Sequence, residues 1–279
     1  AIMLDYYDLT RDKKFRDDTL VPYATEIIAF FDQHWKRGAD GKILFYPAQS
    51  LETWWDSKNP TPEIAGLRYV IPRLHKITGT KTWQKTFDDL PPVPLSADGK
   101  RIEPGETYAI RANGENPELY AVFPYRLYTL GAGKEALDIA KNTYAARRFP
   151  GTGCWFQNAI DAAMLGLADQ ARNMAVANAS ATAGGFRFPA MWGTPFDWMP
   201  DQCNGGVMMS ALQRMLIQYE GDKIYVLPAW PKDWDVSFKL HAPKNTTIEG
   251  ELRAGKIAKL EVTPASRKKD VEVIELRPL

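Results

Sequence analysis

Apolar residues recur at helical spacing through the first 218 residues, and the segments that carry them come in pairs. Thr61-Pro62-Glu63 is typical of a helix start, and Gly79 of a helix end. Helices are expected over residues 2–11, 20–37, 61–79, 80–90, 116–130, 137–148, 156–167, 171–179 and 207–216. Paired helices with short connections are typical of helical hairpins packed into an array. The pattern therefore predicts a mainly α-helical domain.

The period changes after Gln218, where apolar residues alternate with polar ones. Arg253-Ala254-Gly255-Lys256 is typical of a hairpin turn between two such segments. Short antiparallel strands are expected over residues 223–227, 236–240, 248–252, 258–262 and 271–276. The sequence thus predicts a helical domain over residues 1–218 and a small antiparallel β domain over residues 219–279.

The number of helices bears on the shape of the helical domain. An (α/α)6 toroid is built from six hairpins, and the nine helices expected here are too few to close it. Ile2 also begins a helical stripe without a capping residue before it. We therefore expect an (α/α)6 toroid that is incomplete at the N-terminus, with the missing N-terminal portion of the same protein as a partner.

Composition excludes several classes of function. The 35 Lys and Arg residues balance 34 Asp and Glu residues, so no nucleic-acid partner is expected. No apolar run has the length of a membrane span. The histidines His34, His75 and His241 are scattered, and Cys154 and Cys203 lack the spacing of metal ligands, so no metal site is predicted. No glycine-rich phosphate cradle is present, and no organic cofactor is expected.

Long connections between the helix pairs contain many Trp residues together with acidic and amide residues. Alternate connections of an up-and-down array emerge at the same end, so these loops are expected on one face. Aromatic rings pack on the apolar faces of sugars, which favours a carbohydrate ligand. The expected substrate-binding residues are Gln49, Trp54, Trp55, Asp56, Glu115, Asn116, Trp155, Gln157, Trp192, Asp197, Trp198 and Asn204.

Two carboxylates on this face are candidates for glycoside hydrolysis, which needs an acid and a base on opposite sides of a sugar. Glu52 is the expected general acid, because the neighbouring Leu51 and Trp54 would desolvate its carboxyl and keep it protonated. Asp201 precedes the last expected helix and is placed on the base side. The alternatives are a solvated loop glutamate for Glu52 and a helix cap for Asp201.

Five segments carry a resemblance to a known family, and they occur in the order 47–56, 116–125, 151–155, 200–206 and 227–234. Together they resemble the C-terminal two-thirds of the (α/α)6 glycosidases of the family 95 type, inverting α-L-fucosidases and α-galactosidases among them. The resemblance implies an inverting mechanism, with Glu52 as acid and Asp201 polarising an Asn that lies upstream of Ala1. It also implies a periplasmic or secreted location.

The sequence therefore predicts an inverting glycoside hydrolase that acts on a plant or host glycan. One alternative is a non-catalytic carbohydrate-binding toroid, which would keep the aromatic loop face without turnover. Another is a polysaccharide lyase on the same fold, in which Tyr46 or Tyr120 would be the base.

Overall fold

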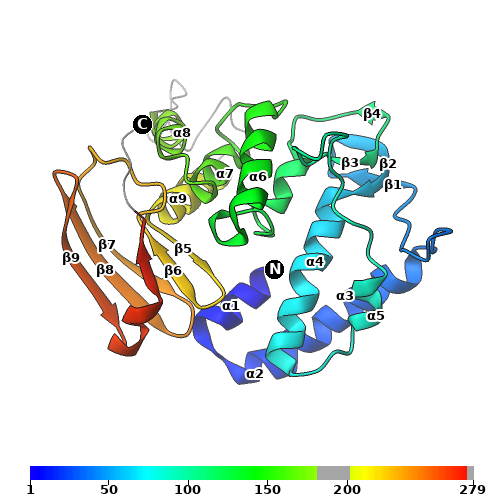
Figure 1. Cartoon of the computed structure of the whole chain (residues 1–279), viewed down its shortest axis with the longest axis horizontal. Coiled ribbons are helices and arrows are strands. Elements are labelled where there is room, and N and C mark those ends of the chain that lie inside the picture. The colour runs from blue at the N-terminus through cyan, green and yellow to red at the C-terminus, as the bar shows by residue number, and fades with distance from the viewer. Residues whose placement is uncertain (181–201, 275–279) are drawn as a thin grey trace. The chain divides into compact units, whose positions relative to one another are not determined.

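A computed structural model describes residues 1–180 and 202–274, and the chain divides into two compact units, Ala1–Phe149 and Pro150–Leu279 (Figure 1). These units are defined by packing, whereas the predicted boundary at residue 218 separates helices from strands. That boundary stays a prediction. None of the helices in the described ranges combines the length and apolarity that a membrane crossing requires.

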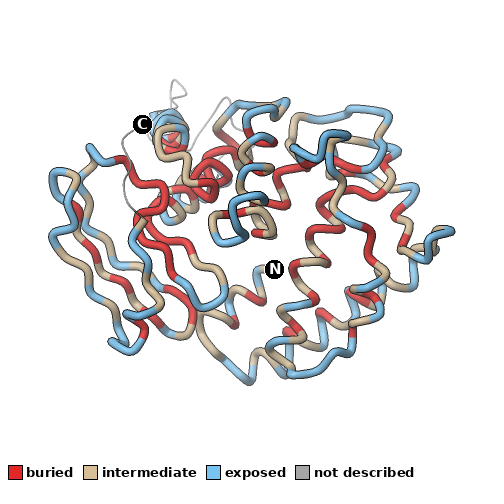
Figure 2. The backbone as a smooth tube through the Cα atoms, in the orientation of Figure 1, coloured by how far each residue is buried: buried red, intermediate tan, exposed pale blue. Residues whose placement is uncertain are grey.

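The helices expected at the start of the first unit are confirmed as α1 (Ile2–Thr10), α3 (Val21–His34), α4 (Thr61–Thr78) and α5 (Gln84–Asp88). Two short helical segments between α1 and α3, α2 (Lys13–Phe15) and the π-helical η1 (Arg16–Leu20), were not expected. The core of these helices contains Leu4, Ile28, Ile64, Ile71 and Leu74, all 2% exposed or less. Buried positions recur along these helices in Figure 2. The apolar stripes that predicted the helices are therefore the faces that they bury.

Gly79 lies after the end of α4, and Thr61 lies at its start. Gly79 has a φ of 73°, and its backbone N–H donates to His75, so the glycine ends the helix in the left-handed conformation. Thr61 was expected to cap the start, but its hydroxyl donates to the carbonyl of Glu103 at 2.6 Å. The start of α4 is therefore tied to a segment about 40 residues further along the chain.

The helix expected over residues 116–130 is wrong. The structure has only two short 3₁₀ turns there, η2 (Pro117–Ala121) and η3 (Leu130–Ala132). Pro124 has no N–H to donate and disfavours the helical conformation at the residue before it. Arg126 has a φ of 46°, which a helix does not permit. The next helix, α6 (Lys134–Ala146), lies where it was expected.

A small antiparallel sheet lies in the first unit, in segments that were expected to be loops. It consists of β1 (Ala48–Ser50), β2 (Trp54–Pro60), β3 (Gly105–Thr107) and β4 (Ile110–Arg111). The central strand β2 pairs with each of the other three strands. The sheet thereby brings the connection after Gly38 against the connection after Pro91.

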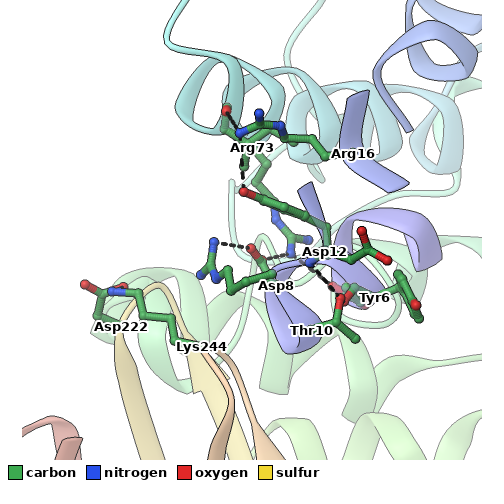
Figure 3. A network of polar contacts seen from close by, with 12 residues as sticks. Tyr6, Asp8, Thr10, Asp12, Arg16, Arg73, Asp222 and Lys244 are labelled. Carbon is green, nitrogen blue, oxygen red and sulfur yellow. Dashed lines mark hydrogen bonds and ion pairs between the residues drawn. The ribbon is translucent and has the colours of Figure 1, made fainter. Parts of the chain in front are cut away.

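Polar contacts fasten α1 to the rest of the first unit. The Asp5 carboxylate accepts hydrogen bonds from Tyr69 at 3.1 Å, Arg73 at 3.0 Å and Arg126 at 2.6 Å. Arg73 also pairs with Asp8, one turn further along α1 (Figure 3). The guanidinium groups of Arg73 and Arg126 lie 4.4 and 5.1 Å from the ring centre of Tyr69. One carboxylate thus neutralises two closely spaced cations.

The described part of the second unit, residues 150–180 and 202–274, contains three α-helices and two three-stranded sheets. The helices are α7 (Asn158–Met164), α8 (Ala168–Ser180) and α9 (Gln202–Leu216). One sheet has the order β10 (Val271–Val273), β6 (Lys223–Val226), β5 (Ile217–Glu220). The other has β7 (Val236–Ala242), β8 (Thr246–Arg253) and β9 (Lys256–Thr263) side by side (Figure 1). The expected turn between β8 and β9 is confirmed, since Arg253 pairs with Lys256.

Two features of these sheets differ from expectation. β5 was not expected as a strand, and it forms a hairpin with β6. β10 was expected to be antiparallel, but it runs parallel to β6. Alternation of apolar residues reports which face is buried and carries no information on strand direction. Here the 3₁₀ turn η5 (Ala265–Asp270) precedes the parallel strand.

Replacing Gly250 by Ala is expected to lower the free energy of unfolding by about 1–3 kcal/mol. Gly250 pairs with Phe238 across β8 and β7, and an added Cβ would lie 2.4 Å from Cζ of that ring. The ring would have to leave its place over the glycine. Chemical denaturation measures the change, with Glu251→Ala on the other face of β8 as the control. Equal denaturation midpoints for Gly250→Ala and the parent chain would contradict the prediction.

Candidate functional site

The first unit contains a cavity of about 230 Å³. It lies where β2, the connection after α5, η2 and the end of α6 meet. Its lining residues are Trp54, Arg101, Ile102, Glu103, Pro104, Tyr108, Glu115, Glu118, Thr143, Ala146 and Arg148. The cavity therefore combines an aromatic pair with three carboxyl groups and two guanidinium groups.

Two rings form an aromatic wall of this cavity. The centres of the Trp54 and Tyr108 rings are 4.6 Å apart, and the rings are tilted by 43°. The guanidinium of Arg148 lies 5.5 Å from the Trp54 ring centre. Trp54 belongs to β2 and pairs with Arg111 of β4, so the sheet holds the indole in place. A half-buried aromatic wall of this kind suits the apolar face of a sugar ring.

Glu118 is the most perturbed carboxyl of the cavity. It occupies the first turn of η2, and 8% of the residue is exposed. Burial raises the pKa of its carboxyl to about 7, and the charge of Glu103 adds to the rise. A hydrogen bond from its own backbone N–H opposes the shift. A carboxyl with this pKa keeps its proton to a higher pH than an exposed glutamate does.

Glu115 is the second perturbed carboxyl. Burial raises its pKa, and the charge of Glu52 acts in the same direction. The Thr53 hydroxyl, at 3.3 Å, and the backbone N–H of Glu52 donate to the Glu115 carboxylate and lower its pKa. The carboxylate is therefore held by donors from the turn between β1 and β2.

Tyr108 and Glu103 form a hydrogen-bonded pair at the cavity. The Tyr108 hydroxyl donates to Oε2 of Glu103 at 2.9 Å. Burial and this hydrogen bond raise the pKa of Tyr108 to about 12, while the charge of Arg101 opposes the rise. The phenol is therefore protonated at neutral pH and acts as a donor.

Some of the predicted residues of the first unit line the cavity, and others do not. Trp54 and Glu115 line the cavity, and their role in substrate binding stays a prediction. Glu52 is exposed, and its carboxylate accepts a hydrogen bond from Asn113 at 3.0 Å. The expected desolvation of Glu52 is therefore not observed, because the two Trp side chains after it do not cover it. Its role as general acid stays a prediction.

Other predicted residues of the first unit lie outside the cavity lining. Gln49, Trp55 and Asp56 are exposed. Asn116 binds the backbone of Phe149 with both ends of its amide, at 2.9 and 3.1 Å. This two-sided hydrogen bond holds the chain after the end of α6. The substrate-binding role expected of these four residues stays a prediction.

Some of the predicted residues of the second unit belong to the described part of the chain, and others do not. Trp155 packs on Phe156, with ring centres 4.5 Å apart, and Gln157 is the residue before α7. Asn204 is buried in α9 and donates to the carbonyl of Asn178. Asp201, Trp192, Asp197 and Trp198 lie outside the described residues. The expectation that all the long loops share one face stays a prediction.

Sequence reasoning missed Glu103, Tyr108, Arg101, Arg148 and, above all, Glu118. Glu118 was read only as a residue of a helix start, since the acidic first turn of a helix is a common structural feature. The available signal was the apolar character of the residues that follow it, which indicates burial of the whole turn. Among residues 1–180 and 202–274, no cluster of three or more His, Cys, Asp or Glu side chains has the arrangement of a metal site.

Comparison with known proteins shows a likeness at the level of fold. No protein-family model and no curated protein sequence matches the chain. A solved structure described as "Putative kojibiose phosphorylase from human microbiome" superposes with a TM-score of 0.61 at 14% identity. The match covers 90% of this chain and 41% of that one, so this chain spans about two fifths of its length. The likeness shows that this chain shares the fold of part of that structure, and it does not single out the family 95 type. The (α/α)6 toroid stays a prediction.

Proposed function

We propose that this chain is a carbohydrate-active enzyme that cleaves glycosidic bonds at the cavity of the first unit. The observation that carries the proposal is Glu118, a buried carboxyl with a pKa of about 7 that lines a cavity with an aromatic wall. A group that keeps its proton near neutral pH can protonate the oxygen of a leaving sugar. The likeness of fold to a carbohydrate phosphorylase supports the same class of substrate.

Glycosidic cleavage needs a second carboxyl, and Glu115 lines the same cavity. Its hydrogen bonds from Thr53 and from the backbone of Glu52 stabilise the ionised form, which suits a base or a nucleophile. The assignment of Glu52 as acid and Asp201 on the base side is the competing one. Exposure of Glu52 favours Glu118 for the acid, because desolvation is what raises a carboxyl pKa.

The specific form that we propose is an inverting glycoside hydrolase acting on a plant or host glycan, as the family 95 resemblance implies. The phosphorylase neighbour supports a second form, in which inorganic phosphate replaces water as the acceptor. Both forms use a protonated carboxyl at the leaving oxygen. They differ in the product, which is a free sugar in one case and a sugar phosphate in the other.

Product analysis tests the proposal. The protein is incubated with a panel of oligosaccharides and aryl glycosides, with and without inorganic phosphate, while Trp fluorescence reports binding. We expect a free sugar with inverted anomeric configuration, seen by NMR at early times. A sugar phosphate would favour phosphorolysis, and an unsaturated uronate would favour a lyase. Absence of both binding and turnover across the panel would overturn the proposal.

A further inference from the structure

We infer that the cavity selects an acidic sugar, whose carboxylate is bound by the guanidinium groups of Arg101 and Arg148. The inference rests on the proposed function, because it names the class of sugar that enters the same cavity. Both arginines line the cavity beside its aromatic wall, and the described residues offer neither guanidinium an acidic partner.

Several arginines away from the cavity pair with carboxylates, whereas Arg68 and Arg147 donate to backbone carbonyls and Arg111 lies over Phe149. Arg16 pairs with Asp17, Arg37 with Asp32 and Asp89, and Arg73 and Arg126 with Asp5. These pairs show the usual outcome when a guanidinium lies near an acidic side chain, because the planar fork fits a carboxylate with two hydrogen bonds.

Arg101 and Arg148 differ from these arginines although three glutamates line the cavity with them. Within residues 1–180 and 202–274, the structure shows no side-chain hydrogen bond or ion pair for either guanidinium. The charge of Arg101 reaches Tyr108, whose pKa it lowers, and also Asp98. Arg148 lies over Trp54. Both guanidinium groups therefore lie beside the aromatic wall, and no side chain of the described residues accepts their N–H donors.

The cavity glutamates do not occupy the N–H donors of these two cations. Glu103 accepts a hydrogen bond from the hydroxyl of Tyr108, and Glu115 accepts one from the hydroxyl of Thr53. Burial raises the pKa of Glu118 and so reduces its negative charge near neutral pH. The two guanidinium groups therefore keep N–H donors for the carboxylate of a ligand. A uronate has a carboxylate on a sugar ring. Its ring can pack on the aromatic wall while its carboxylate binds the guanidinium groups.

Matched ligands and matched variants test this inference. The probes are an oligogalacturonate and the neutral galactose oligosaccharide of the same length, measured by calorimetry at low and at high salt. The variants are Arg101→Gln, Arg148→Gln and the double variant. The control is Arg111→Gln, which removes another exposed arginine that lies over an aromatic ring, Phe149, outside the cavity. Thermal unfolding verifies that each variant is folded.

We expect the parent chain to bind the acidic ligand more tightly than the neutral one, and salt to reduce the difference. The double variant should lose about tenfold or more in affinity for the acidic ligand, while its affinity for the neutral ligand should change little. Arg111→Gln should change little in affinity for either ligand. Equal affinities for the two ligands in the parent chain would overturn the inference and leave the proposed function standing. Inorganic phosphate that binds as well as the uronate and is lost in the same variants would also overturn it. Absence of binding by either oligosaccharide would count against the proposed function itself.

Discussion

Replacing Asp5 by Ala is expected to lower the free energy of unfolding of the first unit by about 3 kcal/mol. The Asp5 carboxylate accepts hydrogen bonds from Tyr69, Arg73 and Arg126, and the Arg126 side chain is only 6% exposed. Without the carboxylate, two guanidinium groups would remain stacked near one ring with less compensation. Chemical denaturation monitored by circular dichroism measures the loss.

Asp18→Ala is the matched control, because Asp18 also pairs with a cation in the first unit but is exposed together with its partner Lys14. An exposed pair contributes little, so a change below about 0.5 kcal/mol is expected. Asp5→Asn should lie between the two, since the amide keeps one acceptor and loses the charge. Equal losses in Asp5→Ala and Asp18→Ala would show that the network around Asp5 does not fasten α1.

The helices were predictable where local signals agree. In α4 the apolar stripe, the proline at its start and the glycine after its end all indicate the same helix. The turn between β8 and β9 was predictable for a similar reason, because Ala254 and Gly255 both adopt positive φ, as that turn type requires. Such elements are determined by residues close together in the sequence.

The small sheet of the first unit was not predictable in the same way. β2 runs from Trp54 to Pro60 with mostly polar residues, and its partners β3 and β4 begin at Gly105 and Ile110. Its hydrogen bonds therefore depend on a segment about 50 residues away. Local propensity carries little information about such a strand.

The candidate site was likewise predictable only in part, because some of its features depend on how the chain packs. Loop aromatics pointed to Trp54 and Glu115, and both line the cavity. Burial decides the protonation of a carboxyl, however, and burial is a property of the packed chain. Glu52 was expected to be desolvated by its sequence neighbours and is exposed. Glu118 is buried, and the only local signal of this was the apolar character of the residues that follow it.

Replacing Glu118 by Gln is expected to slow cleavage of substrates with poor leaving groups by about 10²–10⁴-fold, the usual contribution of a general acid. Gln keeps the shape of the side chain and removes the transferable proton. Activated aryl glycosides should be slowed far less, since their leaving groups need little protonation. Steady-state rates on the two substrate types measure the difference, and Glu52→Gln tests the competing assignment in the same assay.

Glu63→Gln is the matched control for this variant. Burial raises the pKa of Glu63 to about 7 as well, and this residue also lies in the first turn of a helix, but it is not among the cavity lining. Both carboxyls have folded-state pKa values above their ordinary value of 4.5, so the folded chain binds more protons than the unfolded chain between about pH 4.5 and 7. Stability should therefore fall as pH rises through that range, and each Gln variant should flatten the slope.

Activity measurements distinguish Glu118 from Glu63, whereas the pH dependence of stability does not. If Glu118 is the acid, the decline in rate as pH rises above about 7 reports loss of its proton, and Glu118→Gln should abolish that limb of the profile. Glu63→Gln should retain the limb and the dependence on the leaving group. The same loss in both variants, or a loss in Glu118→Gln that is equal for good and poor leaving groups, would assign Glu118 to the folding of η2. In that case the proton would have to come from another group, and the leaving-group dependence of Glu52→Gln would decide whether that group is Glu52.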